Sequence, residues 1–284
     1  MPMCGLNNRR DWRSLLFILI SCSLLFAPFN LELHGWFAVL WVTVSCLFCF
    51  CVSIINHNHH HHRLFGSHRL NGLVGIVMSV ARGHSSISVR LAHNENHHRH
   101  AGTQQDWIRP ELAGAGFGLL RMSRFVVGAI RTMAQGKREQ EADFFQEITL
   151  TQLRIEKLVV TLLAILLLAV DWQKTLIFVL IPWFVGVVLL IGVNLLQHDG
   201  CDTQSTYNHS RNFVSPLGNW FLFNNGYHTI HHISPGLHWS ELPEKHRECV
   251  EPKMNKSLIS HSILVYLFSE YILSLRRNKT GEAS

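Results

Sequence analysis

The sequence is poor in charge. Only 15% of its 284 residues are charged, whereas 48% are hydrophobic and the mean hydropathy is positive. Soluble domains carry closer to a quarter charged residues, so this composition speaks against an ordinary soluble protein and indicates one that lies in a membrane. The net charge is nevertheless +6. A cytoplasmic membrane face next to anionic lipid accounts for that excess.

The chain also lacks the motifs of several other protein classes. No basic residues alternate with aromatic ones and no zinc-finger spacing is present, so we expect no nucleic-acid partner. No His-Pro-Gly-Gly haem motif and no ferredoxin cysteine spacing appear. The seven cysteines do not predict a disulfide framework. Cys46 and Cys49 have C-x-x-C spacing, but they lie in an apolar run and are predicted to be buried thiols.

Four apolar runs predict membrane-spanning helices, at residues 15–29, 36–55, 158–170 and 175–196. The twenty residues of the second would reach roughly 30 Å as a helix, which is the hydrocarbon thickness of a bilayer. Short turns at 30–35 and 171–174 pair the runs into two hairpins. We therefore predict an all-α membrane protein with four transmembrane helices and one domain over residues 1–284.

The distribution of basic residues predicts the orientation. Residues 63–157 are rich in Arg and Lys, whereas the two hairpin turns hold only Lys174. The positive-inside rule then places both termini and a cap of residues 56–157 and 197–284 in the cytoplasm. The run Leu19-Ile20-Ser21-Cys22 also resembles a lipoprotein signal, but no exported soluble domain follows it, and we favour a first membrane helix.

Three further stretches are predicted to be helices at the membrane surface: 72–92, 112–135 and 257–275. In the second, apolar residues alternate with Arg121, Arg124 and Arg131. That pattern suits a helix lying on an anionic surface, or one that grips an acidic headgroup.

What the chain has in abundance is histidine, with 20 residues. Three clusters, at 57–62, 93–98 and 228–232, lie beside apolar runs and have the spacings H-x3-H, H-x3-HH and H-x2-HH. Neutral imidazole is a common ligand for iron, zinc and copper. Residues four apart on a helix share a face, and the second histidine of a doublet points about 100° away, so one cluster can reach two metals.

These clusters resemble the histidine boxes of the membrane fatty acid desaturase and hydroxylase superfamily, particularly its bacterial members. The resemblance covers about residues 15–246 and is closest at Asn224-Asn225-Gly226-Tyr227-His228-Thr229-Ile230-His231-His232 and Pro235-Gly236-Leu237-His238-Trp239-Ser240-Glu241-Leu242-Pro243. A further N-x3-H element, Asn194 to His198, closes the fourth apolar run. The repeated Glu-x-x-His of soluble di-iron bundles is absent.

The resemblance implies two iron ions and O2 as co-substrate. Carried over residue by residue, it implies nine ligands: His57, His61, His93, His97, His98, His198, His228, His231 and His232. The first box stays ambiguous, since His62 could replace His61 and His59 is a further alternative. Asn194 would hold an iron-bound water. His238 and Asp199 are candidates for hydrogen bonds that orient a ligand.

The implied function is O2-dependent oxidation of an acyl chain in membrane lipid, most simply desaturation of a fatty acid held as a lipid or thioester. Hydroxylation and oxidative decarboxylation to a terminal alkene use the same boxes. A carboxylate held by Asn224, Asn225, Tyr227 and His238 would favour decarboxylation, whereas a headgroup on the basic 121–131 face would favour mid-chain desaturation. No substrate-binding residue is predicted beyond these two options.

The resemblance also implies a separate electron donor of ferredoxin, rubredoxin or cytochrome b5 type with its reductase, and a place in the bacterial inner membrane. The competing class is a metal carrier or transporter. Transporter sites usually lie at the bilayer midplane among charged residues. Here the spans hold few ionisable groups, so we favour the enzyme.

Overall fold

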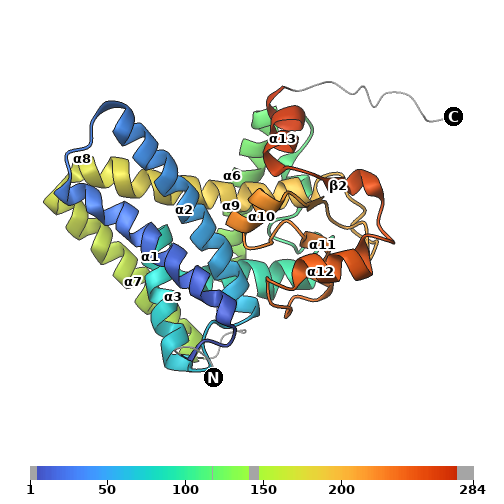
Figure 1. The fold of residues 1–284 in the computed structure, drawn as a ribbon, viewed down its shortest axis with the longest axis horizontal. Helices are drawn as coiled ribbons and strands as arrows, with labels where there is room; N and C mark the ends of the chain where they lie inside the picture. Colours follow the sequence, from blue (N-terminus) through green and yellow to red (C-terminus); the bar gives the residue numbers. More distant parts are fainter. Residues whose placement is uncertain (1–4, 117, 141–146, 274–284) are drawn as a thin grey trace.

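The computed structural model describes residues 5–116, 118–140 and 147–273, and most of them are helical (Figure 1). Part of the predicted cap, residues 141–146, and the tail from 274 lie outside the described residues. The α-helices are α1 Trp12–Phe26, α2 Gly35–His61, α3 His68–Arg82, α4 Ser86–Arg90, α5 His98–His100, α6 Gly118–Gln140, α7 Glu147–Val170, α8 Trp172–Thr175, α9 Ile181–His198, α10 Pro216–Phe221, α11 His228–Ile233, α12 Leu242–Lys245 and α13 Ile263–Leu267.

Shorter elements connect these helices. The 3-10 turns are Arg9–Asp11, Ala27–Asn30, Pro110–Ala113 and Lys256–Leu258, and the π-helical turns are Leu91–His97, Leu176–Leu180, His246–Val250 and Phe268–Ile272. Strands β1 Asn212–Phe213 and β2 Ile259–Ser260 form a parallel pair of two residues each. That pair is a small exception to the predicted all-α fold.

Three helical stretches among the described residues are long and apolar enough to cross a membrane: Arg9–Asn30, Gly35–His61 and Trp172–His198. They correspond to the first, second and fourth predicted spans, and α2 and α9 pack against each other. The third predicted span, 158–170, is the second half of α7. The first half of α7 carries the charged residues Arg154, Glu156 and Lys157. Helix α7 is not one of the three stretches that are apolar enough to cross a membrane.

The third of these stretches stays helical through Pro182. Proline lacks the N–H that an α-helix needs, and its ring crowds the carbonyl four residues earlier. The π-helical turn Leu176–Leu180 comes directly before it and loosens the hydrogen-bond pattern at that carbonyl. The helix can therefore continue to His198, at the edge of the cap.

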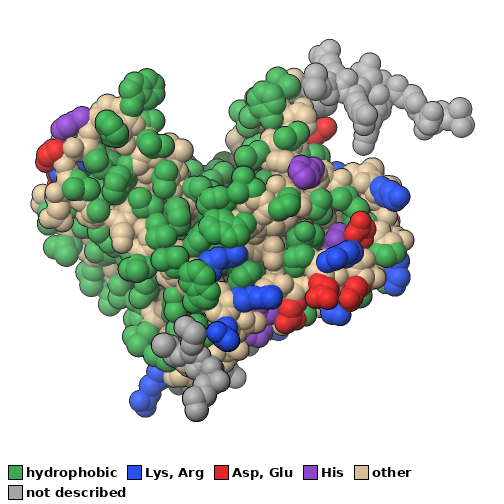
Figure 2. All heavy atoms as spheres, viewed as in Figure 1, with side chains coloured by type: hydrophobic (Ala, Val, Ile, Leu, Met, Phe, Trp, Pro, Cys, Tyr) green, Lys and Arg blue, Asp and Glu red, His purple; other side chains and the backbone are tan. Residues whose placement is uncertain are grey.

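The surface divides into two parts. Figure 2 shows hydrophobic side chains over the part formed by α1, α2, α7 and α9, whereas most charged side chains gather on the side of α11 and α12. Large exposed apolar residues on the first part include Trp36, Phe37, Leu162 and Phe184. This is the distribution expected of a protein with one part in lipid and one in water.

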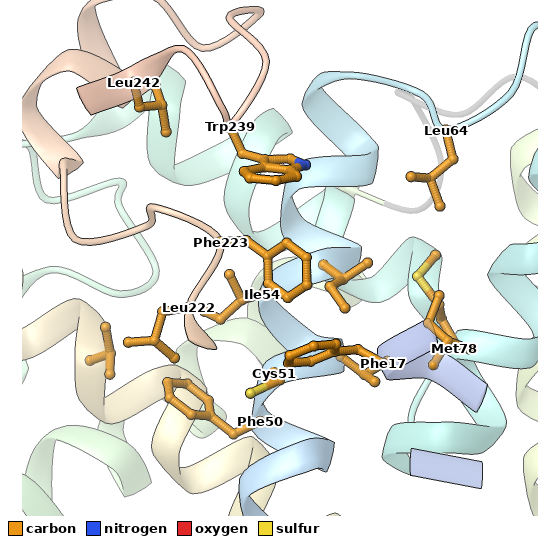
Figure 3. Packing of buried hydrophobic residues seen from close by; sticks show 14 of the residues in the cluster. Phe17, Phe50, Cys51, Ile54, Leu64, Met78, Leu222, Phe223, Trp239 and Leu242 are labelled. Carbon is orange, nitrogen blue, oxygen red and sulfur yellow. The ribbon is translucent and has the colours of Figure 1, made fainter. Parts of the chain in front are cut away.

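A buried cluster joins the amino-terminal helix to the cap. Phe223 lies between Phe17 of α1 and Trp239 of the cap, with ring centroids 5.1 and 5.3 Å away (Figure 3). Burying large side chains of this kind stabilises by about 1.5–3 kcal/mol each. The cluster therefore holds the segment after the third histidine box against α1 and α2.

The three predicted surface helices have other bounds in the structure. The 72–92 stretch breaks after α3, because Gly83 adopts a φ of +79° and its position has no room for a side chain beside Trp183. The 112–135 stretch is a 3-10 turn followed by α6, which buries Phe125 against α9. The 257–275 stretch contains β2, α13 and a π-helical turn instead of one helix.

Candidate metal centre

The nine histidines singled out from the sequence lie together at the cytoplasm-facing ends predicted for α2 and α9, in two groups. The first group contains His57 and His61 of α2, His93 of the π-helical turn and His231 of α11, whose ligand atoms all lie within 4.8 Å of one another. The Nε2 atom of His98 joins this group, at 2.9 Å from Nε2 of His93 and 3.1 Å from Nε2 of His231.

The second group contains His97, His198, His228 and His232, also within 4.8 Å of one another. Nε2 of His198 lies 3.2 Å from Nε2 of His97 and 2.9 Å from Nε2 of His228. The rings of His98 and His232 stack at 4.3 Å, so the two groups adjoin. The doublets 97–98 and 231–232 each divide between the groups, as the 100° turn between neighbouring helix residues predicts.

This arrangement fits two metal ions better than a hydrogen-bond network. A neutral imidazole carries one N–H, so nitrogens that face one another in groups of four cannot all be satisfied by each other. Burial, followed by the neighbouring imidazoles, lowers the pKa of His228 and His232 well below the usual value. Both are therefore neutral at pH 7, which is the form that binds a metal.

The second box is held in place by a π-helical turn. The backbone N–H of His98 donates to the carbonyl of His93, five residues earlier, in the turn Leu91–His97. A π-turn aligns residues i and i+5, so His93 and His98 meet in the first group. His97, one residue before His98, points into the second. Regular α-helix would instead align His93 with His97.

Asp106 orients His97, one of the nine candidate ligands, and it belongs to none of the sequence motifs described above. Its Oδ2 accepts a hydrogen bond from Nδ1 of His97 at 2.8 Å, and both side chains are 1% exposed. Burial favours the neutral acid, but His97 and the N–H of Ile108 outweigh it, and the pKa of Asp106 is lowered. Because the proton of His97 is held on Nδ1, Nε2 is free to bind a metal. Only a His–Asp spacing of nine residues could have suggested this pair.

The remaining candidates of the first box point elsewhere. Nδ1 of His59 accepts from the backbone N–H of Leu64, and its Nε2 lies 3.2 Å from Arg63. His62 lies with Asp11 and His238 in a separate cluster. The geometry therefore selects His57 with His61 as the pair that faces the other boxes.

Two other residues, Asn194 and Asp199, were considered beside the ligands. The Asn194 side chain donates to the Ile108 carbonyl at 2.9 Å. Asp199 makes no hydrogen bond to a histidine within the described residues; it forms an ion pair with Arg121 and accepts from Tyr271 at 2.7 Å. That pairing also removes Arg121 from the predicted basic face. His198 is held instead by the carbonyl of His209, at 3.1 Å from its Nδ1.

An apolar cavity of about 270 Å³ reaches the histidines. Its polar lining residues include His57, His93 and His228 together with Asn194. Aliphatic side chains from α4, α6 and α9 form most of the remaining wall: Val89, Ile130, Met133, Val187, Leu190, Ile191 and Val193. The cavity can therefore hold a hydrocarbon chain beside the metal groups.

A second apolar cavity, of about 470 Å³, contains none of the nine histidines. It shares Val193, Gln197 and Asn225 with the first. The Gln197 side chain donates to the Asn225 carbonyl at 2.9 Å, so this hydrogen bond lies where the two cavities meet.

Comparison with known proteins agrees with this geometry. The model of the fatty acid desaturase family matches residues 30–264, which include all the histidines described above. A search of curated proteins found no match. Since the family model covers most of the chain, the protein belongs to the fatty acid desaturase family.

Proposed function

We propose that this protein is a membrane di-iron oxidoreductase that desaturates a fatty acyl chain between carbons remote from its carboxyl end. Family membership implies an oxidoreductase and suggests acyl-chain oxidation. The observation that carries the more specific proposal is the mostly apolar cavity whose lining includes His57, His93 and His228. Its aliphatic wall suits methylene groups rather than a charged headgroup.

Each of the two histidine groups would bind one iron ion. His57, His61, His93, His98 and His231 would hold one iron, and His97, His198, His228 and His232 the other. Bound iron with open positions would supply the O2 chemistry that an unactivated C–H bond requires. The protein's part is to fix the imidazole tautomers and to hold one stretch of the chain within reach, since small displacements change which hydrogen is accessible.

Contacts in the cap favour mid-chain oxidation over chemistry at the acid end. Two of the polar groups considered for a carboxylate have other partners, because Asn224 donates to the carbonyl of Trp239 and His238 faces Asp11. Helix α6, which carries the arginines of the predicted basic face, contributes Ile130 and Met133 to the cavity. A headgroup near α6 would leave the apolar chain to enter the cavity.

The membrane setting is part of the proposal. The second half of α7 exposes Leu158, Leu162, Leu166 and Val170, which suits contact with lipid. We infer that this segment crosses the membrane, in addition to the three long apolar stretches, and that the cap faces the cytoplasm of a bacterial inner membrane. A separate ferredoxin, rubredoxin or cytochrome b5-type donor would then deliver electrons to the cap.

Isotope labelling tests the reaction. The chain is expressed with a ferredoxin and its reductase, the cells receive fatty acids deuterated at single positions, and the lipids are analysed by mass spectrometry. We expect loss of deuterium from two adjacent mid-chain carbons. His228→Ala should abolish the product, whereas the exposed His261→Ala should retain it.

Other outcomes identify the competing functions. Label loss confined to carbon 3, with release of CO2 and a terminal alkene one carbon shorter, would establish a decarboxylase. Gain of one oxygen atom would establish a hydroxylase. Tightly bound zinc in both histidine groups, with no O2-dependent product, would establish a metal carrier.

A further inference from the structure

A third cluster of metal-ligating side chains lies outside the two histidine groups. It consists of Asp11, His62 and His238, whose ligand atoms all lie within 4.8 Å of one another. Asp11 ends the turn before α1, His62 follows the last residue of α2, and His238 lies in the segment between α11 and α12. Three distant parts of the chain thus meet at one point.

Asp11 is a buried carboxylate with spare ligand capacity. Its side chain is 2% exposed, and its Oδ1 accepts from Nε1 of Trp239 at 2.9 Å and from the Ser14 hydroxyl at 3.3 Å. Its Oδ2 is buried and has no hydrogen-bond partner among the residues that the structure describes. Among the described residues, no Lys or Arg nitrogen lies within 4.0 Å of a carboxylate oxygen of Asp11. A buried charge of this kind is costly unless it is paired or binds a cation.

The two imidazoles face the same point. Nδ1 of His238 accepts from the backbone N–H of Ser240 at 3.3 Å and lies 2.8 Å from the hydroxyl of the same residue, so Nε2 carries the ring proton towards Asp11 while no metal is bound. With a metal at Nε2, the proton would lie on Nδ1 and would be donated to that hydroxyl. The Nδ1 of His62 is buried and has no hydrogen-bond partner within the described residues. The rings of His62 and His238 lie 5.1 Å apart, near perpendicular at 80°.

We propose that Asp11, His62 and His238 bind a divalent metal ion, zinc in particular, at a structural site separate from the iron centre. Zinc binds histidine nitrogen and aspartate oxygen at about 2.0–2.2 Å in a tetrahedron, which places neighbouring ligand atoms about 3.3 Å apart. Nε2 of His238 and Oδ1 of Asp11 are already 3.3 Å apart, and Oδ2 of the same carboxylate is the oxygen without a hydrogen-bond partner among the described residues. A rotation of the half-buried His62 ring would bring in the third ligand, and water would complete the shell.

The location indicates a structural role. Within the described residues, none of the three ligands lines either apolar cavity. Trp239, next to His238, packs against Phe223 and so belongs to the buried cluster shown in Figure 3. A metal here would fasten the start of α1 and the end of α2 to the segment that follows the third histidine box. The end of α2 carries the first box.

Metal analysis of the full chain in detergent tests the proposal. The purified protein is loaded with Fe²⁺ under anaerobic conditions, incubated with Zn²⁺ and desalted. The number of iron and zinc ions per chain is then measured by elemental mass spectrometry. We expect about one zinc per chain beside the iron. Asp11→Asn, which keeps an oxygen for Trp239, should reduce zinc to near zero and leave the iron content unchanged.

Controls separate this site from the iron centre. Glu244→Gln removes an exposed carboxylate from the neighbouring α12 and should retain both metals. His228→Ala should lose iron but keep the zinc. In the wild-type protein, Co²⁺ in place of Zn²⁺ should give the visible absorption of a tetrahedral site, and Asp11→Asn should lack it.

Two results would overturn the proposal: zinc retained at wild-type level in Asp11→Asn, or wild-type protein that binds no zinc and shows no tetrahedral Co²⁺ spectrum. The wild-type measurements decide the matter even if the variant fails to fold. Absence of iron with zinc still present at Asp11 would count against the proposed function alone.

Discussion

Replacing Asp106 with Asn tests how the second histidine group is controlled. The two carboxylate oxygens of Asp106 have separate tasks, because Oδ2 accepts from His97 and Oδ1 accepts from the backbone N–H of Ile108 at 2.9 Å. Asparagine has one oxygen and one NH2 group. If the oxygen stays with Ile108, the NH2 group faces Nδ1 of His97 and favours the tautomer with its proton on Nε2. That tautomer cannot bind iron through Nε2.

The expected cost follows from this geometry. A buried donor left without its acceptor costs about 1–3 kcal/mol, and loss of a group that orients a metal ligand typically lowers metal affinity or activity about 10–100-fold. We therefore expect Asp106→Asn to weaken iron binding by about that factor and to lower turnover in parallel. Chelator competition, followed by iron analysis and product formation from the same preparation, measures both.

Asp199→Asn is the matched control. Asp199 adjoins His198 in sequence, but its carboxylate pairs with Arg121 and Tyr271. This variant should lose stability while keeping wild-type iron affinity. Equal iron affinity in Asp106→Asn and the wild type would refute the argument, and a loss in Asp199→Asn as large as in Asp106→Asn would show that the effect is not specific to His97.

Three further predictions concern the first box, the break after α3 and the topology. His61→Ala should lose iron from the first group, whereas His59→Ala, which removes a ring turned towards Arg63, should keep it when metals are measured. Gly83→Ala should destabilise by about 2–4 kcal/mol in detergent denaturation, because φ is +79° and a Cβ would lie 2.3 Å from an indole ring; unchanged stability would contradict the described backbone. Reporter fusions after Asn30 should read as external and those after Gly136 as cytoplasmic, and the reverse pattern would overturn the proposed orientation.

Periodicity and spacing predicted the parts of the fold that repeat along a helix. Three long apolar runs are helices of membrane-spanning length, and the turn of 100° per residue explains why His231 and His232 point to different groups. The segment 158–170 was harder to assign, because α7 begins among charged residues such as Arg154 and only its second half is continuously apolar.

Features that depend on tertiary contacts could not be read from the sequence. The spacing of His93 and His97 predicts one shared helix face, but the π-helical turn pairs His93 with His98 instead. Asp106 lies in a loop with no periodic pattern, so only the folded chain brings it to His97. The sequence of residues 57–62 does not show that His62 differs in role from its neighbours. The difference depends on the fold, which brings Asp11 from the amino-terminal segment close to His62.

The length of α2 has a consequence for how the two reactants reach the iron. From Gly35 to His57 the helix rises roughly 33 Å at 1.5 Å per residue, slightly more than the hydrocarbon thickness of a bilayer. If α2 spans the bilayer, the length of this one helix determines how deep the histidines lie. It places them at the boundary between lipid and water. A lipid-borne chain could then enter sideways without leaving the bilayer, while electrons arrive from a soluble carrier on the opposite side of the same histidines.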